Sequence, residues 1–255
     1  MESVILIVDE ASPVVAFVET LGRLAIEGMP RNAVIGGVAV MCQLAAAHRP
    51  TADIDALVRD DVVPSAVEVL IADGATRTAN GVDLRGVHID LLEVGDVPKV
   101  EDLPTDELDR SFVIAHSWAL ATAEPMHVMA CTNEGRTLAS VHVDVAIPAA
   151  LVAMKLHAIR QRRGVTLAKR GSDAYDMYRL LSVRDLDGSI AAAIAHAPAE
   201  LGTWSAIQVE ELFVTEADRT LLWIRNAFAA GTVSVAADDL VAVGEAFIGR
   251  VPRDG

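Results

Sequence analysis

Cysteine and clustered metal-binding side chains are scarce in this chain of 255 residues. The two cysteines, Cys42 and Cys131, provide neither the framework of a small disulfide-stabilised protein nor the ligand spacing of a zinc motif. The seven histidines include no His-x-x-x-His pattern and no His/Cys cluster, so a zinc site of that kind is not expected. We therefore expect both cysteines to be small buried residues.

Long apolar runs are also missing, since no stretch approaches the roughly 18 uncharged apolar residues of a membrane-spanning helix. The segment 1–10 is flanked by acidic rather than basic residues and has no cleavage-site pattern, so it does not resemble a signal peptide. Hydrophobic residues nevertheless make up 52% of the chain, which is ample material for a core. These features predict a cytoplasmic globular protein with no membrane partner.

Basic charge is sparse and unevenly distributed. The formal net charge is −15, and such a chain is on average repelled by nucleic acid. One segment departs from this average because it contains six basic residues and no acid: Lys155, Arg160, Arg162, Arg163, Lys169 and Arg170. Two interpretations stay open, namely a local phosphate-facing surface and a solvated helix end whose cations stabilise the helix C-terminus.

A paired glycine followed by two spaced aspartates is the most informative pattern present. Gly36 and Gly37 end an apolar run and open a stretch of small residues, and Asp53 and Asp55 follow in an apolar, β-like context. Alternate residues of a strand share a face, so both carboxylates should project from the same side. A glycine turn lets backbone N–H groups approach a phosphate at a helix N-terminus, where the helix dipole favours anions.

A third carboxylate, Asp90, lies within the apolar run 86–94, which is predicted to be a strand. Acidic residues are rarely buried unless they are paired or bind a metal. A neighbouring strand that brings Asp90 beside Asp53 and Asp55 would explain its position. Three such carboxylates suit Mg2+, with Mn2+ as a substitute, because these ions bind carboxylates together with substrate phosphates. The residues therefore predict a metal and nucleoside triphosphate (NTP) site.

The remaining pattern predicts an α+β fold, with a mixed sheet and flanking helices followed by a mainly helical C-terminal half. Strands are expected at 32–36, 53–58, 75–79, 86–94, 112–114 and 140–146, and helices at 13–27, 37–47 and 64–72. From Pro148, a favourable first residue of a helix, the chain is expected to be helical almost to its end. We expect an α/β domain over 1–146 and a helical domain over 147–255.

The order of strand, Gly-Gly, helix, Asp-x-Asp strand and later Asp strand resembles the nucleotidyltransferase superfamily. Further along, the segments 148–160 and 170–181 resemble the C-terminal signature of the AbiEii/AbiGii-type toxins, a branch that includes the MenT-like toxins of toxin–antitoxin systems. That branch carries a lysine on one helix and an aspartate opening the next, which match Lys155 and Asp173. The resemblance covers roughly residues 30–182.

This resemblance implies a Mg2+-dependent enzyme that transfers a nucleotide from an NTP to the 3′ end of a tRNA and is restrained by a cognate antitoxin protein. Asp53, Asp55 and Asp90 would hold the metal, and Asp90 would take the proton of the attacking hydroxyl. Gly36 and Gly37 would cradle the phosphates.

Three further residues have both a functional and a structural interpretation. Thr51 would place a hydroxyl near phosphate or metal, or it simply leads into the following strand. Lys155 would neutralise the triphosphate, or it buries its stem in the apolar stripe of its helix and keeps its charge in water. Asp173, which shares a helix face with Asp176, would be catalytic, or it stabilises the start of its helix.

Two other functions stay open from the residues alone. A nucleotidyltransferase of the aminoglycoside-modifying kind would use a small cationic acceptor, which suits an acidic protein. A catalytically silent nucleotide-binding module is the other alternative, and it gives no reason for three clustered carboxylates.

Overall fold

The computed structural model describes residues 2–59, 61–162, 167–229 and 232–251. The chain divides into two compact units, of which the first comprises Met1–Asp96 and Ala119–Ile147. The second comprises Val97–Trp118 and Pro148–Gly255, so it includes residues 97–118 in addition to the C-terminal segment. Among the described residues, no helix combines the length and apolar character needed to cross a membrane.

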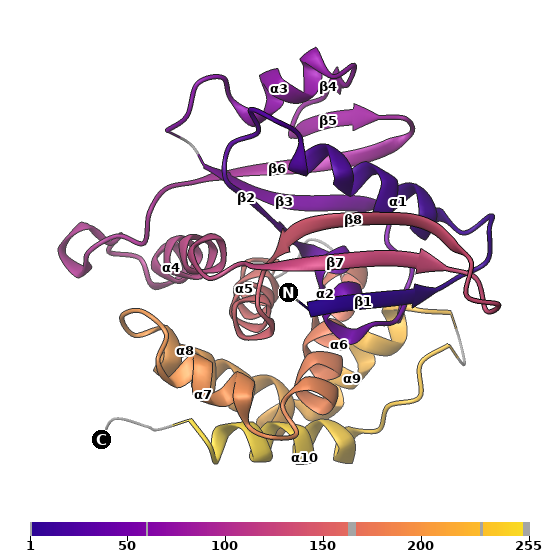
Figure 1. The fold of residues 1–255 in the computed structure, drawn as a ribbon. Helices are drawn as coiled ribbons and strands as arrows, with labels where there is room; N and C mark the ends of the chain where they lie inside the picture. Colours follow the sequence, from indigo (N-terminus) through magenta and orange to yellow (C-terminus); the bar gives the residue numbers. More distant parts are fainter. Residues whose placement is uncertain (1, 60, 163–166, 230–231, 252–255) are drawn as a thin grey trace. The chain divides into compact units, whose positions relative to one another are not determined.

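An eight-stranded mixed sheet forms the centre of the first unit (Figure 1). Its strands are β1 (Glu2–Ile7), β2 (Asn32–Ile35), β3 (Asp53–Arg59), β4 (Thr76–Arg77), β5 (Gly81–Leu84), β6 (Val87–Val94), β7 (Glu124–Cys131) and β8 (Thr137–Val145). They lie in the order β1-β7-β8-β2-β3-β6-β5-β4. The pairs β1–β7, β2–β8 and β3–β6 are parallel and the others are antiparallel. Together with the helical part, this mixed sheet confirms the predicted α+β fold.

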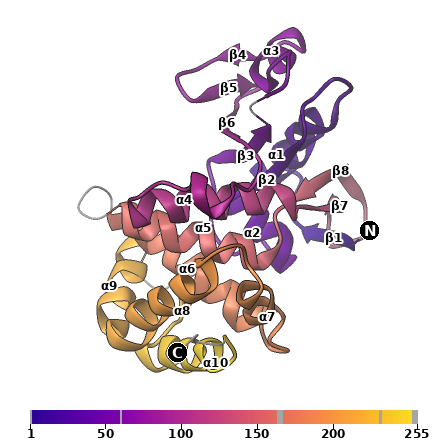
Figure 2. The same ribbon diagram turned by 90° about the vertical axis from the view of Figure 1, so that its left-hand side faces the viewer.

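Three helices accompany the sheet in the first unit: α1 (Pro13–Leu21), α2 (Gly36–Leu44) and α3 (Ala66–Ala72). Helix α1 continues into a 3-10 turn over Gly22–Ala25 and packs on β7 and β8. It buries Val14, Phe17, Val18 and Leu21, whose helical spacing makes one apolar face. Figures 1 and 2 both show α3 beside β4 and β5.

The second unit is helical, and its segment from Pro148 onward confirms the predicted, mainly helical C-terminal half. Its elements are α4 (Glu107–Ala121, which belongs to this unit up to Trp118), α5 (Pro148–Gln161), α6 (Leu167–Arg184), α7 (Ser189–Ala195), α8 (Leu201–Val209), a π-helical turn (Glu210–Thr215), α9 (Ala217–Ala227) and α10 (Ala237–Ile248). Helix α6 packs against α5 and α9. A Cβ atom on Gly171 would lie 2.0 Å from the backbone oxygen of Trp223, so the close approach of α6 and α9 requires glycine.

The strand predicted at 112–114 is wrong, because these residues lie inside α4. The carboxylate of Asp106 accepts hydrogen bonds from the backbone N–H groups of Leu108 and Asp109, which caps the start of this helix. A run of three apolar residues such as 112–114 does not by itself distinguish a strand from a helix.

Candidate metal and phosphate site

Three carboxylates converge on two neighbouring strands of the first unit. Strands β3 and β6 are parallel, and Asp55 lies opposite Asp90 in their register. Asp53 and Asp55 alternate along β3 and therefore share one face. One carboxylate oxygen from each of Asp53, Asp55 and Asp90 lies within 4.8 Å of the others, and all three side chains are half-buried. Oxygen donors at this spacing can converge on one divalent cation.

The glycine turn lies directly against this cluster. Strand β2 ends at Ile35, which pairs with Asp55, and the next residue, Gly36, opens α2. Gly36 has a φ of +67°, a left-handed value that glycine adopts without steric cost. A Cβ atom there would lie 1.8 Å from Oδ2 of Asp55. Gly36 is thus required twice, once by the backbone conformation and once by the neighbouring carboxylate.

Two polar side chains line the second glycine. A Cβ atom on Gly37 would lie 2.7 Å from Nη2 of Arg49 and 3.0 Å from Oγ1 of Thr51. Arg49 donates through Nη1 to the carbonyl of Pro50 at 3.0 Å, and Thr51 donates to the carbonyl of Asp53 at 3.4 Å. The structure therefore places Thr51 at the glycine turn, and its contact with phosphate or metal stays a prediction. Arg49 was missed from the sequence, although a cation four residues before Asp53 in an acidic chain is a usable signal.

His88 is the second residue that sequence reasoning missed. Its Nδ1 lies 2.6 Å from Oδ1 of Asp83, and its Nε2 lies 3.0 Å from Oδ1 of Asp90. A carboxylate at each ring nitrogen favours the protonated form of a histidine, which donates from both nitrogens. The hydrogen bond to Asp83 is the main cause that raises the pKa of His88, and Asp90 adds to it against the effect of burial. The usable signal is the spacing of two between His88 and Asp90, which puts both on one face of β6.

In the second unit, Lys155 and Asp173 lie together in a buried ion cluster made of Lys155, Arg162, Asp173 and Asp176. The Nζ atom of Lys155 lies 2.7 Å from Oδ1 of Asp173 and 2.8 Å from Oδ2 of Asp176. Arg162 pairs with the other oxygen of Asp173. The side chains of Lys155, Asp173 and Asp176 are 9%, 7% and 0% exposed. Lys155 therefore does not keep its charge in water, and its contact with a triphosphate stays a prediction.

Other members of the predicted basic segment also have local partners. Arg160 forms an ion pair of 2.7 Å with Glu211, and the buried Arg170 stacks over the ring of Trp223, 3.5 Å from its centroid. Arg163 lies outside the described residues. With the buried ion cluster, three of the six basic residues, Lys155, Arg160 and Arg162, therefore face carboxylates.

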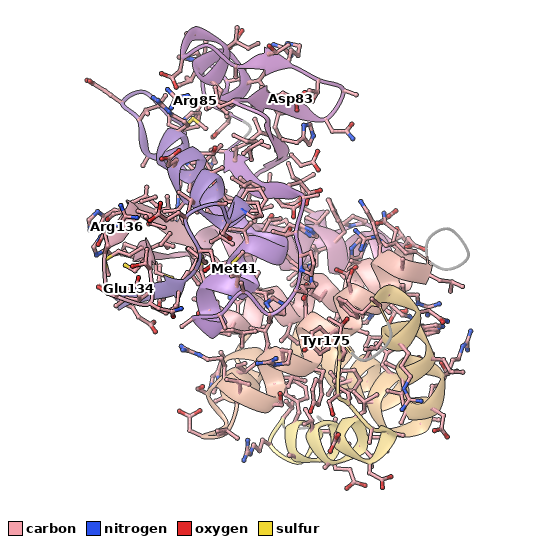
Figure 3. All side chains as sticks on the ribbon, turned by 90° about the vertical axis from the view of Figure 1, so that its right-hand side faces the viewer. Met41, Asp83, Arg85, Glu134, Arg136 and Tyr175 are labelled. Carbon is pink, nitrogen blue, oxygen red and sulfur yellow. The ribbon has the colours of Figure 1, made fainter. Side chains whose placement is uncertain are left out.

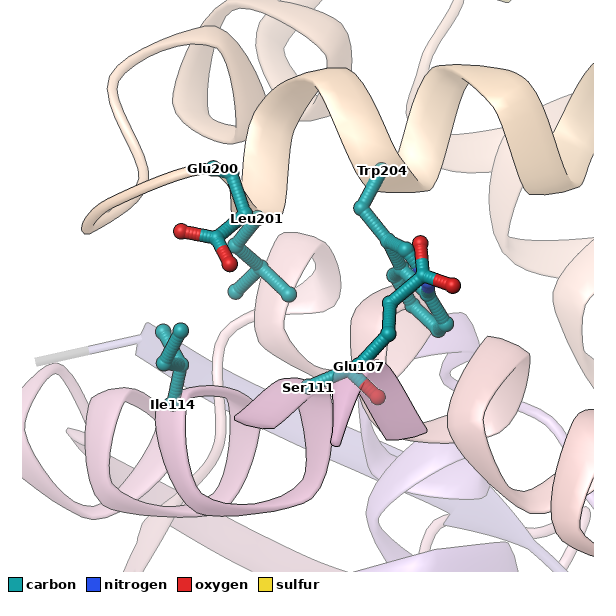
Figure 4. A pocket seen from close by; sticks show the side chains of 6 residues that line it. All are labelled: Glu107, Ser111, Ile114, Glu200, Leu201 and Trp204. Atoms are coloured by element: carbon teal, nitrogen blue, oxygen red, sulfur yellow. The ribbon is translucent and has the colours of Figure 1, made fainter. Parts of the chain in front are cut away.

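A small cavity in the second unit is shown in Figure 4. It is lined by Glu107, Ser111, Ile114, Glu200, Leu201 and Trp204. Its volume is about 10 Å³, which is room for about one water molecule. A nucleotide does not fit into this cavity.

Comparisons with known proteins leave the function to be argued from these residues. No family model matches the sequence, and no curated protein matches it. Among solved structures, the chain is similar to an antigenic nucleotidyltransferase-like protein from Paracoccidioides brasiliensis, with a TM-score of 0.39 and 17% sequence identity. The match covers 72% of this chain and 84% of that chain. A likeness with so low a TM-score carries no argument about the function of this chain.

Proposed function

We propose that this protein is a metal-dependent nucleotidyltransferase, which joins a nucleoside monophosphate from an NTP to a hydroxyl acceptor and releases pyrophosphate. The observation that supports this proposal is the arrangement of Gly36, at the N-terminus of α2, directly against Asp55 in a cluster of three carboxylates. A turn that presents backbone N–H groups binds phosphate oxygens. A carboxylate cluster beside it binds the cation that accompanies those phosphates.

The donor set fits Mg2+ or Mn2+. All three side chains of the cluster, Asp53, Asp55 and Asp90, offer carboxylate oxygens, which are the ligands that these hard ions prefer. When bound, such an ion stabilises the negative charge that develops on the transferred phosphoryl group and on the leaving oxygen.

The residues of the chain would contribute positioning and proton transfer. Backbone N–H groups at Gly36 and Gly37 would hold phosphate oxygens, with the hydroxyl of Thr51 and the guanidinium of Arg49 as further donors. The acceptor oxygen forms a bond to the α-phosphorus as the bond to the bridging oxygen of the β-phosphate breaks. The hydroxyl proton passes to the carboxylate of Asp90, and pyrophosphate leaves with the bonding electrons.

We further propose that the acceptor is RNA, at the 3′ end of a tRNA, and that the protein is a cytoplasmic toxin of the AbiEii/MenT-like kind with a cognate antitoxin. The support for this finer proposal is the resemblance of the segments around Lys155 and Asp173. In the structure these two side chains form a direct ion pair, which agrees with a shared role.

A small cationic acceptor is the second candidate, and one observation favours it. Lys155, Arg160 and Arg162 each face a carboxylate, so the basic segment offers less positive charge to RNA than its sequence indicates. On an acidic protein, a cationic acceptor is attracted without any basic surface.

The test is incubation of the protein with each α-labelled NTP, Mg2+ and either total tRNA or an aminoglycoside. We expect label on one acceptor with the wild type and none with Asp53→Asn. The thermal midpoint of this variant should be unchanged or raised, because one of three clustered like charges is removed. Asp109→Asn is the matched control, since Asp109 is exposed and belongs to an acidic-x-acidic pair outside the cluster, and it should label normally. Full labelling by Asp53→Asn would overturn the proposed function.

A further inference from the structure

The side chains of Asp83, His88 and Asp90 form a continuous chain that ends in the three-carboxylate cluster. We propose that His88, supported by Asp83, is a positioning residue that holds Asp90 in the orientation needed to bind the metal. This inference rests on the proposed function, because it assigns a role within the same metal site.

Backbone pairing fixes the geometry of this chain of contacts. In the antiparallel pair β5–β6, Asp83 lies directly opposite His88, so its carboxylate reaches Nδ1 across the ladder. Asp83 is labelled in Figure 3. Two residues further along β6, Asp90 shares a face with His88 and meets its Nε2. In the parallel pair β3–β6, Asp53 lies opposite His88, so the ring stands at the edge of the cluster.

Electrostatic repulsion explains why Asp90 needs such support. The carboxylates of Asp53 and Asp55 have oxygens within 4.8 Å of an oxygen of Asp90, so the three like charges push one another apart when no cation is bound. A rotation of the Asp90 side chain would relieve this repulsion and remove a metal ligand. The hydrogen bond of 3.0 Å from His88 opposes that rotation.

The same bond fixes the rotation of the Asp90 carboxylate, and therefore the direction in which its oxygens face the other two carboxylates. Mg2+ demands near-ideal octahedral geometry and is sensitive to the angle at which each oxygen is presented. Partners that orient metal ligands in this way typically contribute about 10–100-fold to metal affinity.

Two amide substitutions of His88 distinguish the roles of its two ring nitrogens. The amide nitrogen of glutamine extends about as far as Nε2, whereas that of asparagine extends only about as far as Nδ1. His88→Gln therefore keeps a donor for Asp90 and loses the one for Asp83. His88→Asn does the reverse. Neither variant carries a positive charge, so the pair holds charge constant while it moves the donor.

The experiment is titration of the whole protein with Mn2+ alone at pH 7.5, followed by electron paramagnetic resonance, for the wild type and both variants. We expect His88→Asn to weaken Mn2+ binding by about 10–100-fold and His88→Gln to remain much closer to the wild type. Asp83→Ala should weaken binding less than His88→Asn, because it removes only the support of the ring. His142→Asn, at an exposed histidine on β8, is the control and should bind Mn2+ like the wild type.

Thermal melts of every variant test whether His88 has a merely structural role. A general loss of stability would lower Mn2+ affinity in His88→Asn and His88→Gln alike, whereas the positioning role predicts a difference between them. If His88→Asn binds Mn2+ as tightly as the wild type, the positioning role is refuted while the proposed metal site stands. If both variants bind Mn2+ more tightly, His88 acts only as a competing cation and the inference is also refuted. If the wild type binds no Mn2+, the proposed metal site fails, and the positioning role fails with it.

Discussion

Replacing Gly36 by alanine should separate the effect of backbone strain from the effect of a displaced metal ligand. The backbone at Gly36 has a φ of +67°, and a Cβ atom there would lie 1.8 Å from Oδ2 and 2.9 Å from Cβ of Asp55. Ordinary contacts of this kind begin at 3.4 Å. Because the Cβ atom of Asp55 is also too close, rotation of its carboxylate alone does not relieve the clash.

Gly28 provides a matched control for the strain. Its φ is +81°, and no atom lies within 4 Å of the position that a Cβ atom would occupy. Gly28→Ala should therefore cost only the left-handed backbone term of about 1–2 kcal/mol. Gly36→Ala should lower the free energy of unfolding by the same amount and should also shift Asp55 by roughly 1 Å or more. Metal–ligand distances tolerate only about 0.2 Å.

The assay measures Mn2+ affinity and the urea midpoint for both variants. Both should lose stability, but only Gly36→Ala should lose Mn2+ affinity, by at least about tenfold, because one ligand no longer reaches the ion. If Gly36→Ala binds Mn2+ like Gly28→Ala, then Asp55 is not a ligand, and the argument that joins the glycine turn to the metal is refuted.

Two further predictions concern the second unit. Burial lowers the pKa of His116 from 6.5 to about 4, so the unfolded state binds a proton at a higher pH than the folded state does. The free energy of unfolding should therefore be highest above about pH 6.5 and should fall by up to about 3 kcal/mol as the pH drops to 4. Between pH 4 and 7, the urea midpoint of His116→Asn should depend less on pH than that of the wild type. His196→Gln, at an exposed histidine, should keep the pH dependence of the wild type. An equal pH dependence in His116→Asn and the wild type would refute this role of His116. Lys155→Met should lower the free energy of unfolding by about 3–5 kcal/mol, because it removes the lysine that pairs with the fully buried Asp176 and with one oxygen of Asp173. Chemical denaturation would measure this loss, and an unchanged midpoint would contradict it.

The candidate metal cluster was predictable from sequence because its signals are local. Strand periodicity puts Asp53 and Asp55 on one face, and the apolar run around Asp90 marks a strand. Gly36 and Gly37 mark the turn between β2 and α2. Each signal spans only a few residues, and the pairing of β3 with β6 then brings them together.

The partners of these residues were less accessible, because they depend on strand register and helix packing. Nothing in the sequence near His88 indicates that Asp83 lies opposite it, since this requires the short hairpin of β5 and β6, and β5 was not predicted. Likewise, the contact of Lys155 with Asp176 depends on how α5 packs on α6. Residues 112–114 are helical and not extended because the helix that Asp106 caps continues through them.

The energies of its contacts favour an indirect role for Lys155. To bind a phosphate, its Nζ atom would have to leave Asp173 and Asp176, which are 7% and 0% exposed. Parting a buried carboxylate such as Asp176 from its lysine costs about 3–5 kcal/mol, whereas a hydrogen bond to a charged group typically contributes about 1.5–3 kcal/mol. The balance is unfavourable, so Lys155 should remain in the buried ion cluster when an NTP binds. An effect of Lys155 on nucleotide transfer would then act through the positions of α5 and α6, and it would be accompanied by a loss of stability that a direct phosphate ligand would not produce.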